Sequence, residues 1–509
     1  MPPYAAKLPG LLWVAFPFLA WYFSRERKKS VWLEADDREK LLSYVGDAWG
    51  YFRDHLGEKT HFLPTDNVQL SPAYAVAMRT SPTNVGMYLL SLLAARDLGL
   101  IGKEELLPRA RSTAESLGKL RKWNGHLYNW YDLKTLSVLG GGFVSTVDSG
   151  NFVASLIAFC EGAKEYVGET PALLPVISSL SDLVRETDFS SLYDENRRLF
   201  AIGYSSEEGK LSESRYDVFM SEARTTSFLA VALRQVPLEH YFAPLRRVIG
   251  GLGRYGAASW SGTAFEFFMP SIFLPRIRRS LSDIALAYAF RMQRRAAIRG
   301  KFFDRYASVF GISESGYFAF DGAMNYQYRA FGVATLALDP TMKTGRVIAP
   351  YASFLMLEDG PSEVMGNLEE LRRLDMYGEY GFYEALDLDH CRVGRGFAVL
   401  KSYMAHHVGM SILSAANLLK DDIFVKRFLR DPHMRSAREL LAERMPTAVS
   451  PYPKRETQPR RKFRLRRRRR FSCRKSKRAV CFRRKRLCFP TIKRKSSFLP
   501  RGISNISAA

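Results

Sequence analysis

The sequence has few cysteines and lacks the short motifs of nucleotide, metal and serine-hydrolase chemistry. No CxxC pair occurs among its five cysteines, Cys160, Cys391, Cys473, Cys481 and Cys488. This spacing resembles neither a disulfide framework nor a zinc site, and it favours a reducing compartment. No GxxxxGK[ST] is present, no GxGxxG opens a helix and there is no GxSxG elbow. Nucleotide binding and α/β-hydrolase chemistry therefore have no support, and we expect no metal or other cofactor.

Acidic residues are almost absent from the C-terminal tail. Residues 451–509 hold 23 Lys or Arg and one acid, Glu456, so the tail carries +22 of the net charge of +25. The rest of the chain is close to neutral, which argues against a nucleic-acid-binding surface there. We expect 446–509 to be disordered, because its charge overrides any helical pattern. Such a tail could bind nucleic acid or anionic lipid, but a solvated tail without function is the preferred interpretation.

Long hydrophobic runs are rare, and one of them lies at the N-terminus. Residues 8–23 are uncharged and rich in aromatics, and four basic residues follow within 25–29. The run is slightly shorter than the usual membrane span of about 17–25 residues. We expect residues 1–30 to be a membrane anchor, with a buried N-terminal hairpin as the alternative. The basic flank then predicts a bacterial inner-membrane protein whose domain faces the cytoplasm.

From residue 36 to about 445 the pattern is that of helices joined by loops rich in Gly, Pro and Asn. Apolar residues recur at helical spacing in seven segments, 36–57, 84–100, 151–168, 225–236, 282–300, 362–378 and 402–420. About a dozen helices of this kind favour a closed toroid of helix pairs over a four-helix bundle. Short strands are expected at 141–147 and 197–204. We predict an all-α domain over 31–445 with short β hairpins in its loops.

Four glutamates in these loops have aromatic or small neighbours in place of the basic partners of a surface glutamate. They are Glu222, Glu266, Glu314 and Glu384. Cleaving a glycosidic bond needs two carboxyl groups, one to protonate the leaving oxygen and one as base or nucleophile. The proton donor requires a poorly hydrated, aromatic setting. Any one of the four could instead be a structural acid that caps a helix, but together they favour a carbohydrate cleft.

Aromatic and polar residues suited to sugar binding lie in the same kind of loop. Aromatic faces stack on the C–H faces of sugar rings, while carboxylates, amides and histidines bond to the hydroxyls. Besides Glu266 and Glu384, the predicted substrate-binding residues are Trp123, Trp130, Asp148, Asn151, Trp260, Tyr317, Tyr326, Tyr328, His406 and His407. Adjacent histidines on a helix point about 100° apart and do not converge on a metal, so we expect one of the two to bond to a sugar hydroxyl and the other to be used in packing.

Ten motifs, taken in order, resemble a known family. They are RTSPTNVGMYLLS, GHLYNWYDLKTL, STVDSGN, SEARTTSF, SWSGTAFEFFMP, GISESGY, YQYRAFGV, APYAS, YGFYEALD and YMAHHVGMS. From about Leu8 to Met445 the chain resembles the glucoamylase-like domain of cyclic β-1,2-glucan synthases, which is related to bacterial endo-β-1,2-glucanases. The resemblance implies an (α/α)6 barrel that acts on linear β-1,2-glucan and closes the ring by transglycosylation.

The resemblance also implies roles for the glutamates, and it leaves Glu266 and Glu384 as residues that either bind the substrate or support the groups that do. Glu222, in the SEAR motif, corresponds to the general acid/base, and Glu314, in ISES, to the carboxylate on the nucleophile side. The chain departs from the family pattern at Phe310, Val408 and Arg329, where Trp, Gln and a small polar residue are usual. These departures bear on sugar affinity and product size and leave both glutamates in place.

Synthases of this family are far longer than this chain. They carry a nucleotide-sugar glycosyltransferase part before this domain and a phosphorylase-like part after it. The resemblance therefore implies separate modules of these kinds as partners, with β-1,2-glucan as the ligand and no specific nucleic acid. Three functions stay open, namely transglycosylation, hydrolysis of the endo-β-1,2-glucanase type, and glucan binding by a non-catalytic remnant of a split synthase.

Overall fold

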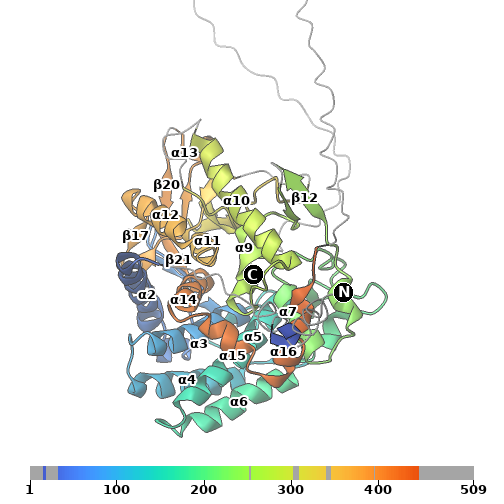
Figure 1. The fold of residues 1–509 in the computed structure, drawn as a ribbon. Helices are drawn as coiled ribbons and strands as arrows, with labels where there is room; N and C mark the ends of the chain where they lie inside the picture. The colour runs from blue at the N-terminus through green and yellow to red at the C-terminus, as the bar shows by residue number, and fades with distance from the viewer. Residues whose placement is uncertain are drawn as a thin grey trace, which may run out of the picture. The chain divides into compact units, whose positions relative to one another are not determined.

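The computed structural model describes residues 15–18, 33–251, 254–301, 309–339, 345–394 and 396–445. From Ala35 onward they form a helix-rich domain with many short strands (Figure 1). The predicted basic tail, 446–509, lies outside the described residues, and so does nearly all of the predicted anchor, 1–30. No helix within the described ranges is long and apolar enough to cross a bilayer.

Two kinds of helix alternate along the chain. Helices with one buried face cover the outside, and these outer helices are α2 (Ala35–His55), α4 (Lys103–Lys119), α6 (Leu173–Glu186), α8 (Glu239–Phe242), α10 (Leu281–Lys301) and α12 (Pro361–Arg373). Helices that are buried on almost all sides lie between them, and these inner helices are α3 (Pro82–Asp97), α5 (Thr146–Ala163), α7 (Arg224–Ala232), α9 (Ala264–Phe268), α11 (Pro350–Leu355) and α14 (Ala405–Leu419). Three further short helices are α13 (His390–Val393), α15 (Ile423–Phe428) and α16 (Pro432–Ser436).

The sequences of the two groups explain this layering. Every residue of α5 is buried, and it carries apolar or small residues on all sides. In α6, by contrast, Leu173, Val176, Ile177, Leu180 and Leu183 are buried at helical spacing and the remaining face is open. A helix that is apolar all round must lie inside, whereas a helix with one apolar stripe covers it.

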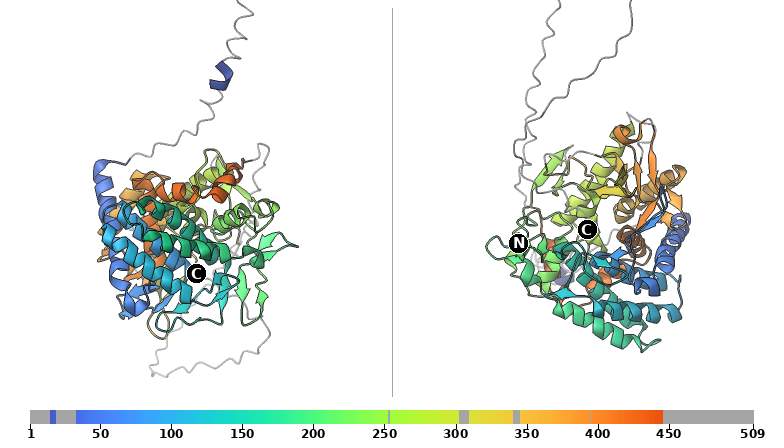
Figure 2. Two further views of the ribbon diagram at one scale, coloured as in Figure 1. Left: turned by 90° about the horizontal axis from the view of Figure 1, so that it is seen from below. Right: turned by 180° about the vertical axis from the view of Figure 1, so that it is seen from behind.

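The inner helices pack against one another around the domain. Helix α3 contacts α5 and α14, α5 contacts α7, and α11 contacts α9 and α14. The chain ends of the domain meet because strand β1 pairs with β21, with Asn67 opposite Met404, and because α14 also packs on α2. Both figures show the blue α2 beside the orange C-terminal elements (Figure 2). This arrangement is consistent with an α/α barrel.

The strands are short and lie in the loops, where they form antiparallel pairs and three-stranded sheets. They are β1 (Asn67–Gln69), β2 (Ala75–Val76), β3 (Arg79–Thr80), β4 (Lys122–Trp123), β5 (His126–Leu127), β6 (Tyr131–Asp132), β7 (Phe143–Ser145), β8 (Tyr193–Asp194), β9 (Leu199–Phe200), β10 (Gly203–Ser205), β11 (Lys210–Leu211), β12 (Val248–Gly251), β13 (Arg254–Ala257), β14 (Ser315–Phe320), β15 (Tyr326–Arg329), β16 (Val347–Ile348), β17 (Tyr377–Gly378), β18 (Gly381–Phe382), β19 (Ala385–Asp387), β20 (Ala398–Leu400) and β21 (Ser402–Met404).

Each of the seven predicted helical segments contains a helix, and both predicted strand regions contain strands, β7 and then β9 with β10. The largest error at the start of a helix is at α5, which begins at Thr146 instead of 151. Ser145 caps it by accepting a hydrogen bond from the Asp148 N–H, so the polar stretch before 151 is a buried first turn of helix. Polar residues there have the composition of a loop, which is why the sequence pattern misplaced the boundary.

Glycine allows the inner helices to approach closely at several contacts. A Cβ on Gly150 of α5 would lie 1.8 Å from Thr226 Oγ1 of α7, and one on Gly86 of α3 would lie 2.7 Å from Ser155 Oγ of α5. We predict that Gly150→Ala destabilises the protein by about 1–3 kcal/mol through overpacking. The shift of the urea unfolding midpoint measures this effect.

Gly366 provides the matched control, because it lies in the outer helix α12, where an added Cβ would meet nothing within 4 Å. There the same substitution should stabilise the protein by about 0.5–1 kcal/mol, since alanine is the better helix former. Equal effects of the two substitutions would contradict close packing between α5 and α7.

Candidate active site

Six of the fourteen predicted site residues lie in, or just before, the first two turns of the inner helices. This convergence was not evident from the sequence, because it depends on how the helices are arranged in the ring. The residues at or just before these helix starts are Thr83 and Asn84 (α3), Asp148 and Asn151 (α5), Glu222 (α7), Glu266 (α9), Tyr351 (α11), and His406 and His407 (α14). Helix N-termini present free N–H groups and the positive end of the helix dipole, so this end of the domain favours negative charge.

Three carboxyl groups lie close enough to affect one another. Burial and then the charge of Glu266 raise the pKa of Glu222 to about 7. Burial, followed by the charges of Glu222 and Glu266, raises the pKa of Glu314 well above its usual value. Burial raises the pKa of Glu266 as well. Because three negative charges cannot share a poorly hydrated site, the cluster holds protons near neutral pH.

Glu266 is the most firmly held of the three. It is the N3 residue of a capping box with Thr263, and its carboxylate accepts hydrogen bonds from the Ser261 N–H at 2.9 Å, the Thr263 N–H at 3.0 Å and Ser259 Oγ at 2.8 Å. These donors stabilise the charged form and oppose the effect of burial. These hydrogen bonds therefore favour an ionised Glu266, which places a fixed negative charge next to the other two carboxyl groups.

Glu222 has little stabilisation of its charge. It accepts one side-chain hydrogen bond, from Ser221 Oγ at 3.0 Å. The buried Arg224 of the same SEAR motif is directed to Met220 Sδ and to the Phe267 carbonyl oxygen instead. Burial lowers the pKa of this arginine to about 10. A carboxyl group in this setting is suited to hold a proton and donate it.

Glu314 lies in the loop before β14, and its carboxylate makes no hydrogen bond with the described residues. Its backbone is held instead. The Tyr351 hydroxyl lies 3.0 Å from the Glu314 carbonyl oxygen and 2.9 Å from Ser313 Oγ. Ser313 Oγ also accepts the Phe265 N–H of α9 at 3.0 Å, which ties this loop to the helix of Glu266. The Glu314 carboxylate is thus left available to a ligand.

Glu384 and His407 form a buried pair. Glu384 Oε2 lies 2.9 Å from His407 Nδ1, and Glu384 Oε1 accepts the Gly316 N–H at 3.0 Å. The imidazole stacks on Tyr351 with ring centroids 3.6 Å apart, and its Nε2 lies 3.4 Å from the hydroxyl of Tyr328. The predicted substrate-binding residues Glu384, His407 and Tyr328 are therefore brought together.

Asp148 lies in the first turn of α5, next to the start of α3. Its Oδ1 accepts a 2.6 Å hydrogen bond from Thr83 Oγ1, to which Asn151 Nδ2 also donates at 3.4 Å. The Asn129 amide fits when its nitrogen donates to Asp148 Oδ2 at 2.9 Å and its oxygen accepts from Trp130 Nε1 at 3.2 Å. Asp148, Asn151 and Trp130 thus form one hydrogen-bonded group.

The remaining predicted residues are placed less uniformly. Trp123 stacks on Tyr204 with centroids 3.9 Å apart, so one of its faces is used in packing hairpins. Trp260 is 54% exposed on the loop before α9 and offers an open aromatic face. Tyr317 and Tyr326 lie on the β14–β15 hairpin and pack partly against the core. Their roles as sugar contacts stay predictions.

His406 is buried, its Nε2 has no hydrogen-bond partner in the described structure, and burial lowers its pKa well below the usual value. A neutral imidazole with an unpartnered nitrogen is able to bond to a sugar hydroxyl.

Several residues near these groups were missed by sequence reasoning. Tyr216 lies within the acidic cluster, since the charges of Glu222, Asp148, Glu314 and Glu266 all add to burial in raising its pKa. Arg79 lies 4.3 Å over the Trp130 ring and pairs with the buried Asp66 at 2.9 Å. The sequence could have indicated Arg79 through an opposite charge, Asp66, and aromatic residues in the neighbouring segments. A single tyrosine such as Tyr216 has no comparable sequence pattern.

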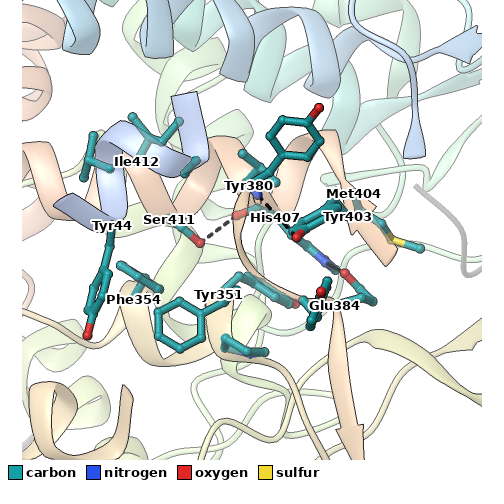
Figure 3. Close-up of a pocket in the computed structure, with 16 residues that line it drawn as sticks. Tyr44, Tyr351, Phe354, Tyr380, Glu384, Tyr403, Met404, His407, Ser411 and Ile412 are labelled. Atoms are coloured by element: carbon teal, nitrogen blue, oxygen red, sulfur yellow. Dashed lines mark hydrogen bonds and ion pairs between the residues drawn. The ribbon is translucent and has the colours of Figure 1, made fainter. Parts of the chain in front are cut away.

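A small cavity of about 30 Å³ lies behind this site, between α2, α11 and α14 (Figure 3). Tyr351, Glu384 and His407 line one side of it, and Val408, where the related family has Gln, is also in its wall. This volume is about that of one water molecule, so the cavity is too small to be a glucan cleft. Within the described residues, no group of three or more His, Cys, Asp or Glu side chains is placed to hold a metal ion.

The raised pKa of Glu314 makes a prediction for stability. At a pH between the ordinary glutamate pKa of about 4.3 and the raised pKa in the folded protein, Glu314 is protonated in the folded state and ionised in the unfolded state. Its contribution to the free energy of unfolding therefore falls as pH rises through this range. Glu314→Gln cannot ionise and should escape this loss. We expect its Tm to exceed that of the wild type by about 2 °C at pH 8 and by less at pH 5. A difference that does not grow with pH would contradict the buried-charge assignment.

Two family models match adjoining parts of the chain. A model described as "Putative glucoamylase" matches residues 215–432, and a model of a protein of unknown function, DUF3131, matches residues 43–216. The chain is 29% identical over 567 aligned positions to cyclic beta-(1,2)-glucan synthase NdvB of Rhizobium meliloti. The match covers 86% of this chain, which spans only 20% of that relative's length.

Solved structures share the fold. An endo-beta-1,2-glucanase from Chitinophaga pinensis, in complex with sophorotriose and glucose, matches with a TM-score of 0.67 at 16% identity, over 80% of this chain and 98% of that one. A glucoamylase-type protein from Bacteroides caccae matches with a TM-score of 0.66 at 16% identity, over 80% of this chain and 99% of that one. An endo-beta-1,2-glucanase variant from Talaromyces funiculosus, in complex with beta-1,2-glucan, matches with a TM-score of 0.59 at 10% identity, over 80% of this chain and 90% of that one. The chain therefore contains a glucoamylase-like domain and is homologous to part of a cyclic β-1,2-glucan synthase.

Proposed function

We propose that the protein cleaves β-1,2-glucan and transfers the cut chain to a sugar hydroxyl, closing a ring when that hydroxyl belongs to the same chain. The observation that carries this proposal is the cluster of Glu222, Glu266 and Glu314, in which Glu222 precedes α7, Glu266 lies in α9 and Glu314 precedes β14, and in which the charges of Glu222 and Glu266 each raise the pKa of a neighbouring carboxyl group. The homology to the synthase supports the choice of β-1,2-glucan as substrate.

In the proposed reaction, Glu222 protonates the glycosidic oxygen as the bond breaks, and Glu314 acts at the anomeric carbon as the nucleophile-side carboxylate. Because the pKa values of both groups are raised, the pair holds a proton near neutral pH, and the reactive form is the one with this proton on Glu222 and with Glu314 ionised. The fixed charge of Glu266 favours one proton staying on the Glu222–Glu314 pair. A sugar hydroxyl then attacks and loses its proton to Glu222, which has become a base. Two displacements keep the β configuration, so the new linkage matches the old one.

Hydrolysis is the second candidate, and the shared fold with the Chitinophaga endo-β-1,2-glucanase over 98% of that chain favours it. The two reactions differ only in whether water or a sugar hydroxyl attacks, which depends on how well the cleft excludes water. A glucan-binding remnant without activity is the third candidate, but the two uncompensated carboxyl groups argue against it.

The finer organisation of the fold and of its partners belongs to the proposal. The alternation of outer and inner helices supports six pairs, α2/α3, α4/α5, α6/α7, α8/α9, α10/α11 and α12/α14, in an (α/α)6 barrel. We further propose that residues 1–30 anchor the chain in a bacterial inner membrane with the domain facing the cytoplasm. Separate glycosyltransferase and phosphorylase-like modules would supply and process the glucan.

Product analysis tests the reaction. With linear β-1,2-glucan as substrate, we expect mass spectrometry to detect cyclic products lighter by one water than linear chains of equal length. Glu222→Gln and Glu314→Gln should each lower the rate by at least about 10²-fold, because each removes a group used in bond cleavage. Short linear products would favour hydrolysis, and an unchanged substrate with folded wild-type protein would contradict both.

The pH profile tests the role of Glu222. Since the acid must be protonated and its pKa is raised to about 7, kcat/KM should fall about tenfold for each pH unit well above 7. The measurement is kcat/KM on linear β-1,2-glucan from pH 5 to 9, with stability checked at each pH. A rate that stays constant up to pH 9 would show that Glu222 is not the proton donor.

A further inference from the structure

The carboxylate of Glu384 is fully used inside the protein. Its side chain is 2% exposed, and its two oxygens contact the Gly316 N–H and His407 Nδ1. A Cβ on Gly316 would lie 3.3 Å from Glu384 Cγ, so glycine at this position admits the close approach of the carboxylate. This geometry leaves Glu384 little capacity to bind a sugar.

His407 continues the chain of contacts to the other side of Glu314. Its ring stacks on Tyr351 at 3.6 Å with an interplanar angle of 8°, and the Tyr351 hydroxyl reaches Ser313 Oγ and the Glu314 carbonyl oxygen. Tyr351, Glu384 and His407 come from α11, the residue before β19 and α14, and Figure 3 shows all three around the same pocket. Glu384 thus contacts the backbone after Glu314, at Gly316, while Tyr351 contacts Ser313 and the Glu314 carbonyl oxygen, and His407 links the two side chains.

We propose that Glu384 and His407 are positioning residues that fix the Glu314 carboxylate. For Glu384 this selects support of the site over substrate contact, the two roles that the sequence left open. The inference rests on the proposed function of Glu314. Because the Glu314 carboxylate itself makes no hydrogen bond with the described residues, its location depends on the backbone at 313–316. Glu384 holds that backbone at Gly316, and His407 holds it at Ser313 and Glu314 through Tyr351.

The test compares Glu384→Ala with Glu384→Gln in the full-length chain acting on linear β-1,2-glucan. Alanine releases Gly316 and His407, so kcat should fall about 10²-fold, as expected of a misplaced catalytic group. Glutamine keeps an acceptor for Gly316, and its amide N–H can donate to His407 Nδ1 when the imidazole carries its proton on Nε2, so it should restore kcat to within about threefold of the wild type, with KM little changed in both variants. The control is Ser411→Ala. Ser411 lies on α14 with His407 and lines the same pocket, and its replacement should leave kcat unchanged.

Hydrogen exchange gives a readout that does not depend on activity. In Glu384→Ala the amides of 313–320 should exchange faster than in the wild type, and in Glu384→Gln they should remain protected. A raised KM with an unchanged kcat in Glu384→Ala would identify a sugar contact and overturn the proposal, as would unchanged exchange. An equal loss of kcat in Glu384→Gln would also overturn it. If the wild type does not act on this glucan, the proposed function fails, whereas the exchange data still decide whether Glu384 holds the loop.

Discussion

The structure of the site depends on keeping three carboxyl groups together in a poorly hydrated place. Glu222, Glu266 and Glu314 each have a raised pKa, and no ion pair to any of them occurs among the described residues. The domain offsets this repulsion by directing the starts of the inner helices toward the site, because helix N-termini favour negative charge. It also gives one of the three, Glu266, a set of hydrogen-bond donors, so that protonation is left to the other two.

Packing between the inner helices brings their N-terminal ends together at the site. Helix α5 is buried along its whole length and contacts α3 and α7 through Gly86 and Gly150, where no side chain would fit. The outer helices add apolar faces that cover the ring. The hairpins then extend from the loops and carry groups such as Glu384 and Tyr328 to the same end. The geometry of the cluster thus depends on helix packing, since Glu222 and Glu266 lie at the starts of α7 and α9 and the Glu314 loop is tied to α9 through Ser313 and the Phe265 N–H.

The sequence predicted the helices, because apolar periodicity is a local property. The lack of basic partners singled out four glutamates, and the structure brings three of them, Glu222, Glu266 and Glu314, close enough to raise one another's pKa. It could not predict which groups share hydrogen bonds. Glu384 was assigned to sugar binding on its aromatic neighbours, but its partners, Gly316 and His407, are distant in the chain. Tyr351 and Tyr216 gave no charge or spacing signal, although both lie at the site. The start of α5 was missed because its polar first turn is stabilised by tertiary burial.

Direct titration of the carboxyl cluster tests the central claim without requiring a substrate. Protein labelled with ¹³C at the glutamate carboxyl carbons is observed by NMR between pH 4 and 9, and the signals are assigned by difference with Glu222→Gln, Glu266→Gln and Glu314→Gln. The account predicts a carboxyl signal that titrates near pH 7 and is lost in Glu222→Gln. It also predicts that Glu314 titrates well above an ordinary glutamate. Titration of all three carboxyl groups below pH 5 would contradict the account, because the site would then hold no proton to donate.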